Sequence, residues 1–359
     1  MHGDTREVRR GEELDWPALA AYLRWHLADG DIPGLRLDAD PELSQFPGGH
    51  SNLTYLVRFG GAELVVRRPP LGPVPPRAHD MAREFRWLAA LHPVFPLAPR
   101  PYLLCEDQSV LGCVFYVMER RRGIVVRGEE PLPLAGHPDV RRRLSEAMID
   151  TLADLHRIDV TSAPLADLGK PIGFLDRQVR GWRERWERSK LDEVPAMDSM
   201  ALWLAAHQPP DALDPAVVHG DFKLDNVLLD PLQPARLVAV FDLEMAALGD
   251  PLIDLGILLA YWTPMEGPGQ TDALTAVTGR EGYMNREQLI DRYVEVSGRD
   301  LSDIAYFEAF ALFKIAVVIQ QIYYRFRRGQ TDDPRFAGLG DRVAALAARA
   351  ERLTIKSEN

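Results

Sequence analysis

The chain has 359 residues, of which 46% are hydrophobic and 26% are charged, a composition typical of folded globular proteins and not of disordered ones. Its formal net charge of −11 argues against a nucleic-acid binder, because affinity for nucleic acids comes largely from neutralising phosphates with Lys and Arg. The two cysteines are too few for a disulfide scaffold or a zinc site. The length favours two folded parts over a single small core.

We expect neither a membrane span nor a secretory leader. No apolar run is expected to approach the roughly 18 residues that cross a bilayer. Residues 1–16 lack the apolar core of a signal peptide. The sequence therefore predicts a cytoplasmic protein that does not act at a membrane.

In chain order, the first predicted element is a helix over residues 15–27, with Asp15 as its N-cap. Two strand-like segments follow within residues 46–57, and Gly48 and Gly49 interrupt them. A glycine turn of this kind lets backbone N–H groups approach phosphate oxygens closely. Taken by itself, such a glycine pair is more often a plain hairpin turn.

The next predicted strand, residues 64–68, ends before a proline. Period-two alternation places Arg67 and Arg68 on opposite faces, so only one of them can face a cleft. The helix expected over residues 79–91 carries an apolar stripe with Glu84 beside it. A carboxylate buried there requires a cationic partner. The alternative is a solvated Glu84 at the edge of the stripe.

Another hairpin is expected over residues 102–118, followed by the charged run 119–122 and a glycine. This change in composition marks a boundary, and beyond it the chain becomes helical. Long helices are expected at residues 140–158, 286–297, 302–327 and 333–352, with Ser302 as an N-cap.

A helix near residues 174–186 carries several arginines and two tryptophans. It could hold an anionic substrate. Alternatively, Trp182 and Trp186 pack inward from a surface helix.

The stretch 217–244 organises the remainder of the chain. Two short apolar runs flank the turn-forming residues 230–234, which predicts an antiparallel hairpin. Asn226 enters its first strand and Asp242 leaves its second, so both side chains are expected at one open end. Asp221 lies five residues before Asn226. Two carboxylates and an amide gathered in this way are oxygen ligands suited to Mg²⁺.

These residues resemble a known family. The pattern H-G-D-x-x-x-x-N followed by F-D-x-E is similar to the catalytic and metal loops of aminoglycoside phosphotransferases and choline kinases, which are small-molecule relatives of protein kinases. The resemblance implies that Asp221 is the catalytic base and that Asn226 and Asp242 are metal ligands. Residues 169–182 resemble, in particular, the kinase-like domain fused to certain acyl-CoA dehydrogenases and its free-standing bacterial homologues.

The resemblance also implies a fold. We expect an α+β, bilobal, protein-kinase-like chain with a sheet-rich N-lobe at 1–118, a hinge at 119–127 and a mainly helical C-lobe at 128–359. Two further residues lie in segments that resemble the family. Asp254 is expected to be an internal brace for the catalytic loop. His156 is expected to be structural, because a lone histidine at a helix terminus is more often a cap or a core contact than a catalyst.

The remaining site residues are expected to bind nucleotide. A loop over the phosphates would use Gly48, Gly49, Ser51 and Asn52. Arg67 stands where the family carries a phosphate-binding lysine, and Glu84 would be its partner. In the linker, backbone groups at Met118, Glu119 and Arg121 would contact the nucleotide base.

The implied activity is transfer of the γ-phosphoryl group of ATP, with Mg²⁺, to a hydroxyl group of a small molecule. A hydroxyacyl compound or another metabolite is favoured over an aminoglycoside as acceptor. The alternative class is a catalytically silent nucleotide-binding pseudokinase, which Arg67 favours and the joint presence of Asp221, Asn226 and Asp242 opposes. The acceptor, the choice between ATP and GTP, and the oligomeric state stay open at this point.

Overall fold

The computed structural model describes residues 4–28, 30–47, 52–71, 79–135, 137–263, 274, 277–331 and 333–357. The chain divides into two compact units: unit 1 comprises Met1–Gly123 and Val238–Glu244, and unit 2 comprises Ile124–Leu237 and Met245–Asn359. The first boundary falls within the segment 119–127, where the sequence predicts a hinge.

The assignment of Val238–Glu244 differs from the predicted partition, which placed everything after residue 127 in one lobe. This segment belongs to unit 1. The N–H of Val240 donates to the carbonyl of Leu97 at 2.9 Å, and the side chains of Asp242 and Glu244 bind residues of the same unit. The chain therefore crosses from one unit to the other three times.

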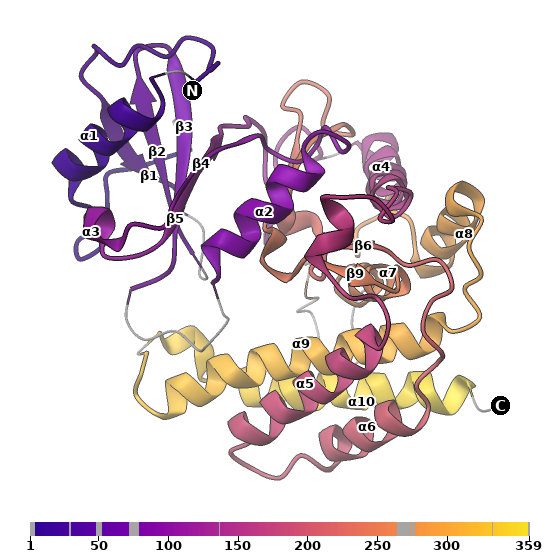
Figure 1. The fold of residues 1–359 in the computed structure, drawn as a ribbon. Helices are drawn as coiled ribbons and strands as arrows, with labels where there is room; N and C mark the ends of the chain where they lie inside the picture. The colour runs from indigo at the N-terminus through magenta and orange to yellow at the C-terminus, as the bar shows by residue number, and fades with distance from the viewer. Residues whose placement is uncertain are drawn as a thin grey trace. The chain divides into compact units, whose positions relative to one another are not determined.

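Unit 1 is built on a five-stranded antiparallel sheet with the strand order β1-β2-β3-β5-β4 (Figure 1). Its strands are β1 (Glu42–Gln45), β2 (Leu53–Phe59), β3 (Ala62–Arg68), β4 (Pro101–Cys105) and β5 (Phe115–Glu119). The predicted hairpin over residues 102–118 is confirmed as the β4–β5 pair. A short helix, α3 (Gln108–Leu111), lies in its connection.

Helices cover both faces of this sheet (Figure 1). Helix α1 (Trp16–His26) packs Leu19 and Leu23 against the face that carries Val66 and Val117. Helix α2 (Met81–Leu91) contacts β4 and β5 and brings Phe85 to within 6.2 Å of the Tyr116 ring. Because side chains alternate along a strand, Arg67 lies on the α2 face, opposite Val66.

The predicted cap of α1 is confirmed. Asp15 Oδ1 accepts a hydrogen bond from the N–H of Ala18 at 3.1 Å, and Pro17 lies in the first turn. A side-chain cap of this kind satisfies one of the N–H groups that have no partner within the helix. The helix is one residue shorter at each end than predicted.

Unit 2 is mainly helical. Its helices are α4 (Pro138–His156), α5 (Phe174–Ser189), α6 (Pro195–Ala206), α7 (Leu252–Trp262), α8 (Arg286–Ser297), α9 (Ile304–Arg327) and α10 (Leu339–Ser357). Strands β6 (Ala216–Val218) and β9 (Ala247–Gly249) pair with each other. β7 (Val227–Leu229) and β8 (Leu237–Val240) form the predicted hairpin, and all of β8 after Leu237 belongs to the segment assigned to unit 1. The 3₁₀ turns are η1 (Leu165–Leu168), η2 (Leu224–Asn226), η3 (Leu243–Met245) and η4 (Pro334–Phe336).

Two predicted helix starts differ from the structure. Helix α9 begins at Ile304 after Asp303, and the hydroxyl of Ser302 donates instead to Asp300 at 3.0 Å, so the prediction of Ser302 as N-cap was wrong. The last helix does not begin at Asp333. That residue caps the one-turn helix η4, and α10 starts at Leu339.

Helix α9 also corrects the expectation that no apolar run reaches membrane-spanning length. Among the described residues it is the one helix that is long and apolar enough to cross a bilayer by length and composition, with 24 residues and a mean hydropathy of 1.4 over its best window. Yet 72% of that window is buried inside the structure. Contacts with α5, α6, α7 and α10 explain this burial, as expected for a core helix.

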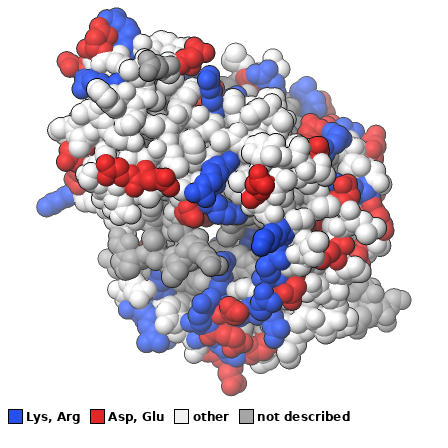
Figure 2. Space-filling model, viewed as in Figure 1, with Lys and Arg blue, Asp and Glu red and all other residues white. Residues whose placement is uncertain are grey.

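The sheet and helices leave a surface of mixed charge. On the face shown in Figure 2, acidic and basic side chains are interspersed. The net negative charge is therefore not gathered into one field on that face.

Helices α7 and α9 approach each other at Gly256. A Cβ atom added there would lie 2.5 Å from the carbonyl oxygen of Phe307, which is closer than side-chain atoms come to backbone. Glycine is therefore required for the two backbones to touch.

We predict that Gly256→Ala lowers the free energy of unfolding by about 1–3 kcal/mol, because the added methyl group must push the two helices apart. Gly181→Ala on α5 is the matched control, since no atom lies within 4 Å of the Cβ position there. The control should stabilise by about 1 kcal/mol through helix propensity. Urea denaturation measures both. Equal effects of the two substitutions would contradict this account of the α7–α9 contact.

Candidate active site

The loop after β6 carries the residues predicted to be catalytic. Gly220 adopts a φ of +80°, and a Cβ atom there would lie 2.8 Å from the carbonyl oxygen and the Cβ of Met245. Only glycine avoids both the backbone strain and the clash. The sharp turn at Gly220 sets the direction in which the chain enters Asp221.

Asp254 on α7 holds this loop from within unit 2. Its carboxylate accepts hydrogen bonds from the N–H groups of His219 at 2.6 Å and Gly220 at 2.7 Å. His156 Nε2 lies 3.3 Å from the same carboxylate, and its Nδ1 lies 2.7 Å from the hydroxyl of Tyr293. The predictions of Asp254 as an internal brace and of His156 as a structural residue are both confirmed.

Two pKa shifts describe this buried pair. Burial lowers the pKa of His156, although Asp254 opposes the shift. Burial alone would raise the pKa of Asp254, but the hydrogen bonds from His156 and from the His219 backbone outweigh it, and the pKa is lowered. A carboxylate that accepts several N–H bonds keeps its charge even without solvent.

Asp221 and Asn226 lie together, as predicted. The amide nitrogen of Asn226 donates to the Asp221 carbonyl at 2.9 Å and to its Oδ2 at 3.0 Å. The side chain of Asp221 is 25% exposed, so its carboxylate is accessible. Because the amide nitrogen of Asn226 is engaged, its oxygen is the atom left for a cation.

Lys223 is a neighbour of Asp221 that the sequence analysis missed. Its Nζ lies 2.8 Å from Asp221 Oδ2 and 4.6 Å from the centre of the Tyr261 ring. Burial alone would lower the pKa of Lys223, but Tyr261 and Asp221 outweigh it and the pKa is raised. Burial also raises the pKa of the nearby Asp225, against the attraction of Lys223. A lysine inside the catalytic loop was the signal available in the sequence.

Lys314 was also missed. It lies on α9, is 6% exposed, and its Nζ donates to the carbonyl of Gly220. The Nζ is 5.4 Å from the centre of the Trp182 ring. Burial lowers the pKa of Lys314 to about 8, and Asp221 and Asp254 oppose that shift. A single lysine between Phe313 and Ile315 in an apolar helix was the signal, because a buried charge requires compensation.

The helix with arginines and tryptophans resolves in favour of inward packing. Trp182 and Trp186 on α5 are 4% and 0% exposed. Arg177 donates to the carbonyl of Ile172 at 2.7 Å, and Arg180 pairs with Asp176 at 2.7 Å. Arg185 lies 4.3 Å over the centre of the Trp182 ring.

In unit 1 the predicted ion pair between Arg67 and Glu84 is present. Arg67 Nε lies 3.3 Å from Glu84 Oε2, and Arg67 Nη2 donates to Asp242 Oδ1 at 2.6 Å. The side chains of Arg67 and Glu84 are 8% and 1% exposed. Burial raises the pKa of Glu84 to about 7, although Arg67 opposes the shift. The alternative of a solvated Glu84 is therefore wrong.

Asp242 has a φ of +70°, a left-handed conformation that is unusual for a residue other than glycine. Such backbone strain is frequent at ligand-binding positions and costs about 1–3 kcal/mol. Its predicted role as a metal ligand, together with Asn226, stays a prediction.

Glu244 collects a second set of contacts in unit 1. Its Oε2 accepts a hydrogen bond from the amide of Asn52 at 3.2 Å and lies 3.5 Å from His79 Nδ1. Its carbonyl accepts from Arg83 Nη1 at 2.6 Å. The sequence analysis named Asn52 but not His79 or Arg83. The contacts of Glu244 fix the segment that ends β8 against α2.

The other predicted nucleotide residues are not decided by these contacts. Gly48, Gly49 and Ser51 lie outside the described residues. The side chain of Glu119 accepts a hydrogen bond from the Arg100 N–H at 3.1 Å and forms an ion pair with Arg121 at 2.8 Å. The side chains of Glu119 and Arg121 therefore contact each other at the end of β5. Met118 is 8% exposed in the same strand. Base recognition by this backbone stays a prediction.

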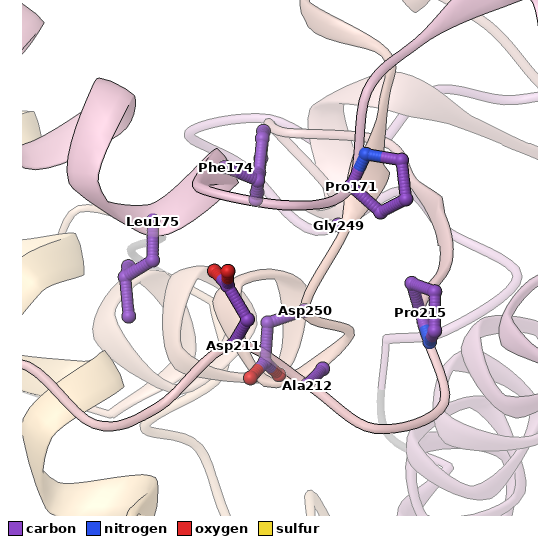
Figure 3. A pocket seen from close by; sticks show the side chains of 8 residues that line it. All are labelled: Pro171, Phe174, Leu175, Asp211, Ala212, Pro215, Gly249 and Asp250. Atoms are coloured by element: carbon purple, nitrogen blue, oxygen red, sulfur yellow. The ribbon is translucent and has the colours of Figure 1, made fainter.

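The residues that line a pocket in unit 2 include none of the predicted catalytic or metal-binding residues (Figure 3). It is a small pocket lined by Pro171, Phe174, Leu175, Asp211, Ala212, Pro215, Gly249 and Asp250. Asp211 accepts the N–H of Gly173 at 2.7 Å, and Asp250 caps α7 by accepting the N–H of Leu252 at 2.9 Å. The two carboxylates of the pocket lining, those of Asp211 and Asp250, are thus already hydrogen-bonded to backbone N–H groups.

The donor chemistry suits the predicted metal. Asn226 in unit 2 offers an amide oxygen, and Asp242 in unit 1 offers a carboxylate; taken separately, each is a hard oxygen donor of the kind that Mg²⁺ takes in addition to water and phosphate. Among the described residues, no group of three or more His, Cys, Asp or Glu side chains could hold a metal by itself. An ion at Asp242 would have to share its carboxylate with Arg67 or displace that contact.

Comparison with known proteins decides the family. The family model described as "Phosphotransferase enzyme family" matches residues 42–289, more than half of the chain. The chain belongs to this phosphotransferase family. Within the family, a putative aminoglycoside phosphotransferase from Ralstonia eutropha has a similar structure, with 30% identity, a TM-score of 0.78 and coverage of 96% of this chain and 99% of that one.

Two further relatives extend the comparison. Acyl-CoA dehydrogenase family member 11 of Mus musculus is 35% identical over 91% of this phosphotransferase chain but only 41% of its own length, so the chain spans less than half of that protein. Choline kinase of Cryptosporidium parvum shares the fold at 11% identity, with a TM-score of 0.66 and coverage of 96% and 97%. The expected α+β, protein-kinase-like fold is confirmed.

The pKa of Glu84 yields a pH prediction. Its folded value of about 7 lies above the ordinary 4.5, so the linked stabilisation is complete below about pH 4.5 and is lost as the pH rises through about 7. Glu84→Gln cannot ionise. We expect the free energy of unfolding of the wild type to fall more steeply between pH 5 and pH 8 than that of the variant, measured by urea denaturation.

The control for this experiment is Glu106→Gln, which changes an exposed carboxylate. Its stability curve should run parallel to that of the wild type. If the curve of Glu84→Gln were parallel too, Glu84 would titrate as a solvated residue and the account of its burial would be refuted.

Proposed function

We propose that this chain is an ATP- and Mg²⁺-dependent phosphotransferase that moves the γ-phosphoryl group to a hydroxyl group of a small molecule. The observation that carries the proposal is the arrangement at Asp221, whose accessible carboxylate lies 3.0 Å from the Asn226 amide and 2.8 Å from Lys223, on a loop braced by Asp254. A base fixed on a rigid loop is what phosphoryl transfer requires of a protein.

The proposed step begins with the acceptor hydroxyl near Asp221. The acceptor oxygen forms a bond to the γ-phosphorus as the bond from that phosphorus to the bridging oxygen of ADP breaks, and Asp221 takes the hydroxyl proton. When bound by Asn226 and Asp242, Mg²⁺ would neutralise charge on the phosphates. Arg67 would add a fixed cation for them, oriented by Glu84.

Proteins that share the fold support the proposal that this chain binds a nucleotide, and among them both adenine and guanine nucleotides occur. An aminoglycoside phosphotransferase at 17% identity was solved with AMP-PNP and hygromycin B, and another at 15% identity was solved with GDP and kanamycin. We propose ATP for this chain. The choice can be tested by comparing kcat/KM for ATP and GTP.

The charges around Asp221 favour an anionic acceptor. Within unit 2, its ion-pair partner is Lys223, and Lys314 binds the adjoining Gly220 carbonyl. Asp225 and the buried Asp254 are further carboxylates nearby, and Arg127 and Arg185 are further cations. Cations beside the base would repel an aminoglycoside and attract a carboxylate or phosphate group of the acceptor. We therefore propose a hydroxyacyl compound, such as a hydroxyacyl-CoA, in keeping with the acyl-CoA dehydrogenase relatives.

A non-catalytic reading has one observation in its favour. Arg67 stands in place of lysine and already pairs with Asp242 at 2.6 Å, which opposes a metal at that carboxylate. A nucleotide-binding pseudokinase is therefore the second candidate. Measurement of catalysis separates the two functions.

We predict that Asp221→Asn lowers kcat for Mg²⁺-dependent transfer by about 10²–10⁴-fold, because the amide cannot accept the hydroxyl proton. Asp242→Ala should weaken Mg²⁺-dependent nucleotide binding, measured by calorimetry. Asp192→Asn, on an exposed carboxylate, is the matched control and should match the wild type. Equal ADP release by all four proteins would favour the pseudokinase.

We predict that kcat/KM for a hydroxyacyl-CoA exceeds that for an aminoglycoside by at least about tenfold at low salt, measured as ADP release. The preference should shrink as ionic strength rises, because salt screens attraction between partly exposed charges. A preference for the aminoglycoside, or a ratio independent of salt, would refute the anionic acceptor while leaving the phosphotransferase assignment intact.

A further inference from the structure

Lys314 is a buried cation that takes no part in the bond formation, bond cleavage or proton transfer of the proposed step. It is 6% exposed in the middle of α9, and it forms no ion pair with any carboxylate in the described part of the chain. Burial of an ammonium group is costly unless other groups compensate for its lost hydration. An apolar side chain of similar length would be cheaper to bury at this point in the helix.

The compensating contacts of Lys314 converge on the catalytic loop. Its Nζ donates to the carbonyl of Gly220, the residue directly before Asp221. On another side the ammonium faces the ring of Trp182, whose centre is 5.4 Å away. The attraction of Asp221 and Asp254 also favours the charged form. The contacts that compensate for burying this charge therefore lie at the loop that carries the base.

Gly220 is held from both ends of its backbone. Its N–H donates to Asp254 at 2.7 Å, and its carbonyl accepts from Lys314. The carbonyl of Gly220 belongs to the same planar peptide unit as the N–H of Asp221. That N–H donates to His219 Nδ1 at 3.2 Å. Fixing this peptide plane therefore fixes the point from which the Asp221 side chain extends.

We propose that Lys314 is the positioning residue of the catalytic loop: its protonated amine, bonded to the Gly220 carbonyl, holds the base Asp221 in its working position. This inference rests on the proposed role of Asp221 in phosphoryl transfer. Lys314 touches neither substrate nor reacting atoms in the proposed step. Loss of its proton removes the charge that binds the carbonyl and attracts Asp221.

The surroundings of Lys314 bring the loss of its proton into a pH range that experiments can reach. The charged groups that face it are Asp221 and Lys223 from the catalytic loop, Asp254 from α7 and Arg185 from α5. Burial lowers its pKa to about 8; the two carboxylates oppose the shift and the two cations add to it. The protonated form therefore dominates below about pH 8 and is lost above it. Phosphoryl transfer should decline over the same range.

The test compares pH profiles of kcat from about pH 6 to about pH 10 for the wild type, Lys314→Met and Lys314→Arg. The wild type should lose activity along a one-proton limb near pH 8. Lys314→Met should lower kcat at neutral pH by about 10–100-fold, as expected for a misplaced base, and should lack the limb. Its KM for the nucleotide should change less than about twofold.

Lys314→Arg keeps a positive charge that does not titrate in this range. The decline of its kcat with pH should therefore move to higher pH, whatever the size of kcat at neutral pH. Lys190→Met is the matched control, because Lys190 pairs with Asp198 at 2.6 Å outside the catalytic loop. It should keep the wild-type limb. If Lys314→Met retained the limb at a uniformly lower kcat, or matched the wild type, Lys314 would not position the base.

A second measurement does not depend on catalysis or on variants. Side-chain ¹⁵N NMR of the wild type should show Lys314 titrating near pH 8, with faster amide exchange at 219–222 above that pH. A midpoint above about 10, or exchange that does not respond, would overturn the proposal. If no acceptor were phosphorylated, the proposed function would fail, yet these two readouts would still decide whether Lys314 orders the loop.

Discussion

The buried carboxylate of Asp254 is the interaction on which the proposed catalytic loop depends. Two successive N–H groups, those of His219 and Gly220, point at it, and each would be left without a partner in a dry environment if it were removed. Conversely, these donors and His156 allow the carboxylate to stay ionised without solvent. The turn therefore depends on the charge of Asp254, and that charge depends on the N–H groups of the turn. This turn determines the position of Asp221, the residue that follows it.

In unit 1, a buried carboxylate is compensated by a cation instead of by backbone N–H groups. Arg67 uses Nε toward Glu84 and Nη2 toward Asp242, at 3.3 Å and 2.6 Å. A guanidinium fork presents donors in fixed directions and can face two carboxylates at once, whereas an ammonium is a compact point charge. The arginine at this position thus ties the strained Asp242 segment to both β3 and α2.

Local patterns explain which features the sequence could predict. Period-two alternation in β3 and the helical stripe of α2 showed that one arginine could face Glu84, and the resemblance to kinases identified it as Arg67. The loop spacing brought Asn226 to Asp221. The contact of Lys314 with Gly220 spans 94 residues, so no local pattern specifies it. The start of α9 was misjudged for another reason: Ser302 can bond locally to Asp300 instead of capping, and short polar side chains compete in this way.

The three crossings of the chain have a consequence for dissecting the molecule. Residues up to Gly123 do not make a complete unit 1, because the peptide Val238–Glu244 arrives from far along the chain and brings Asp242 and Glu244 with it. A fragment cut at the linker would leave Nη2 of Arg67 without its Asp242 acceptor, and Asn52 and Arg83 without their Glu244 acceptors. Simple truncation would thus yield a misfolding-prone piece, and separating the halves requires grafting that heptapeptide onto the first.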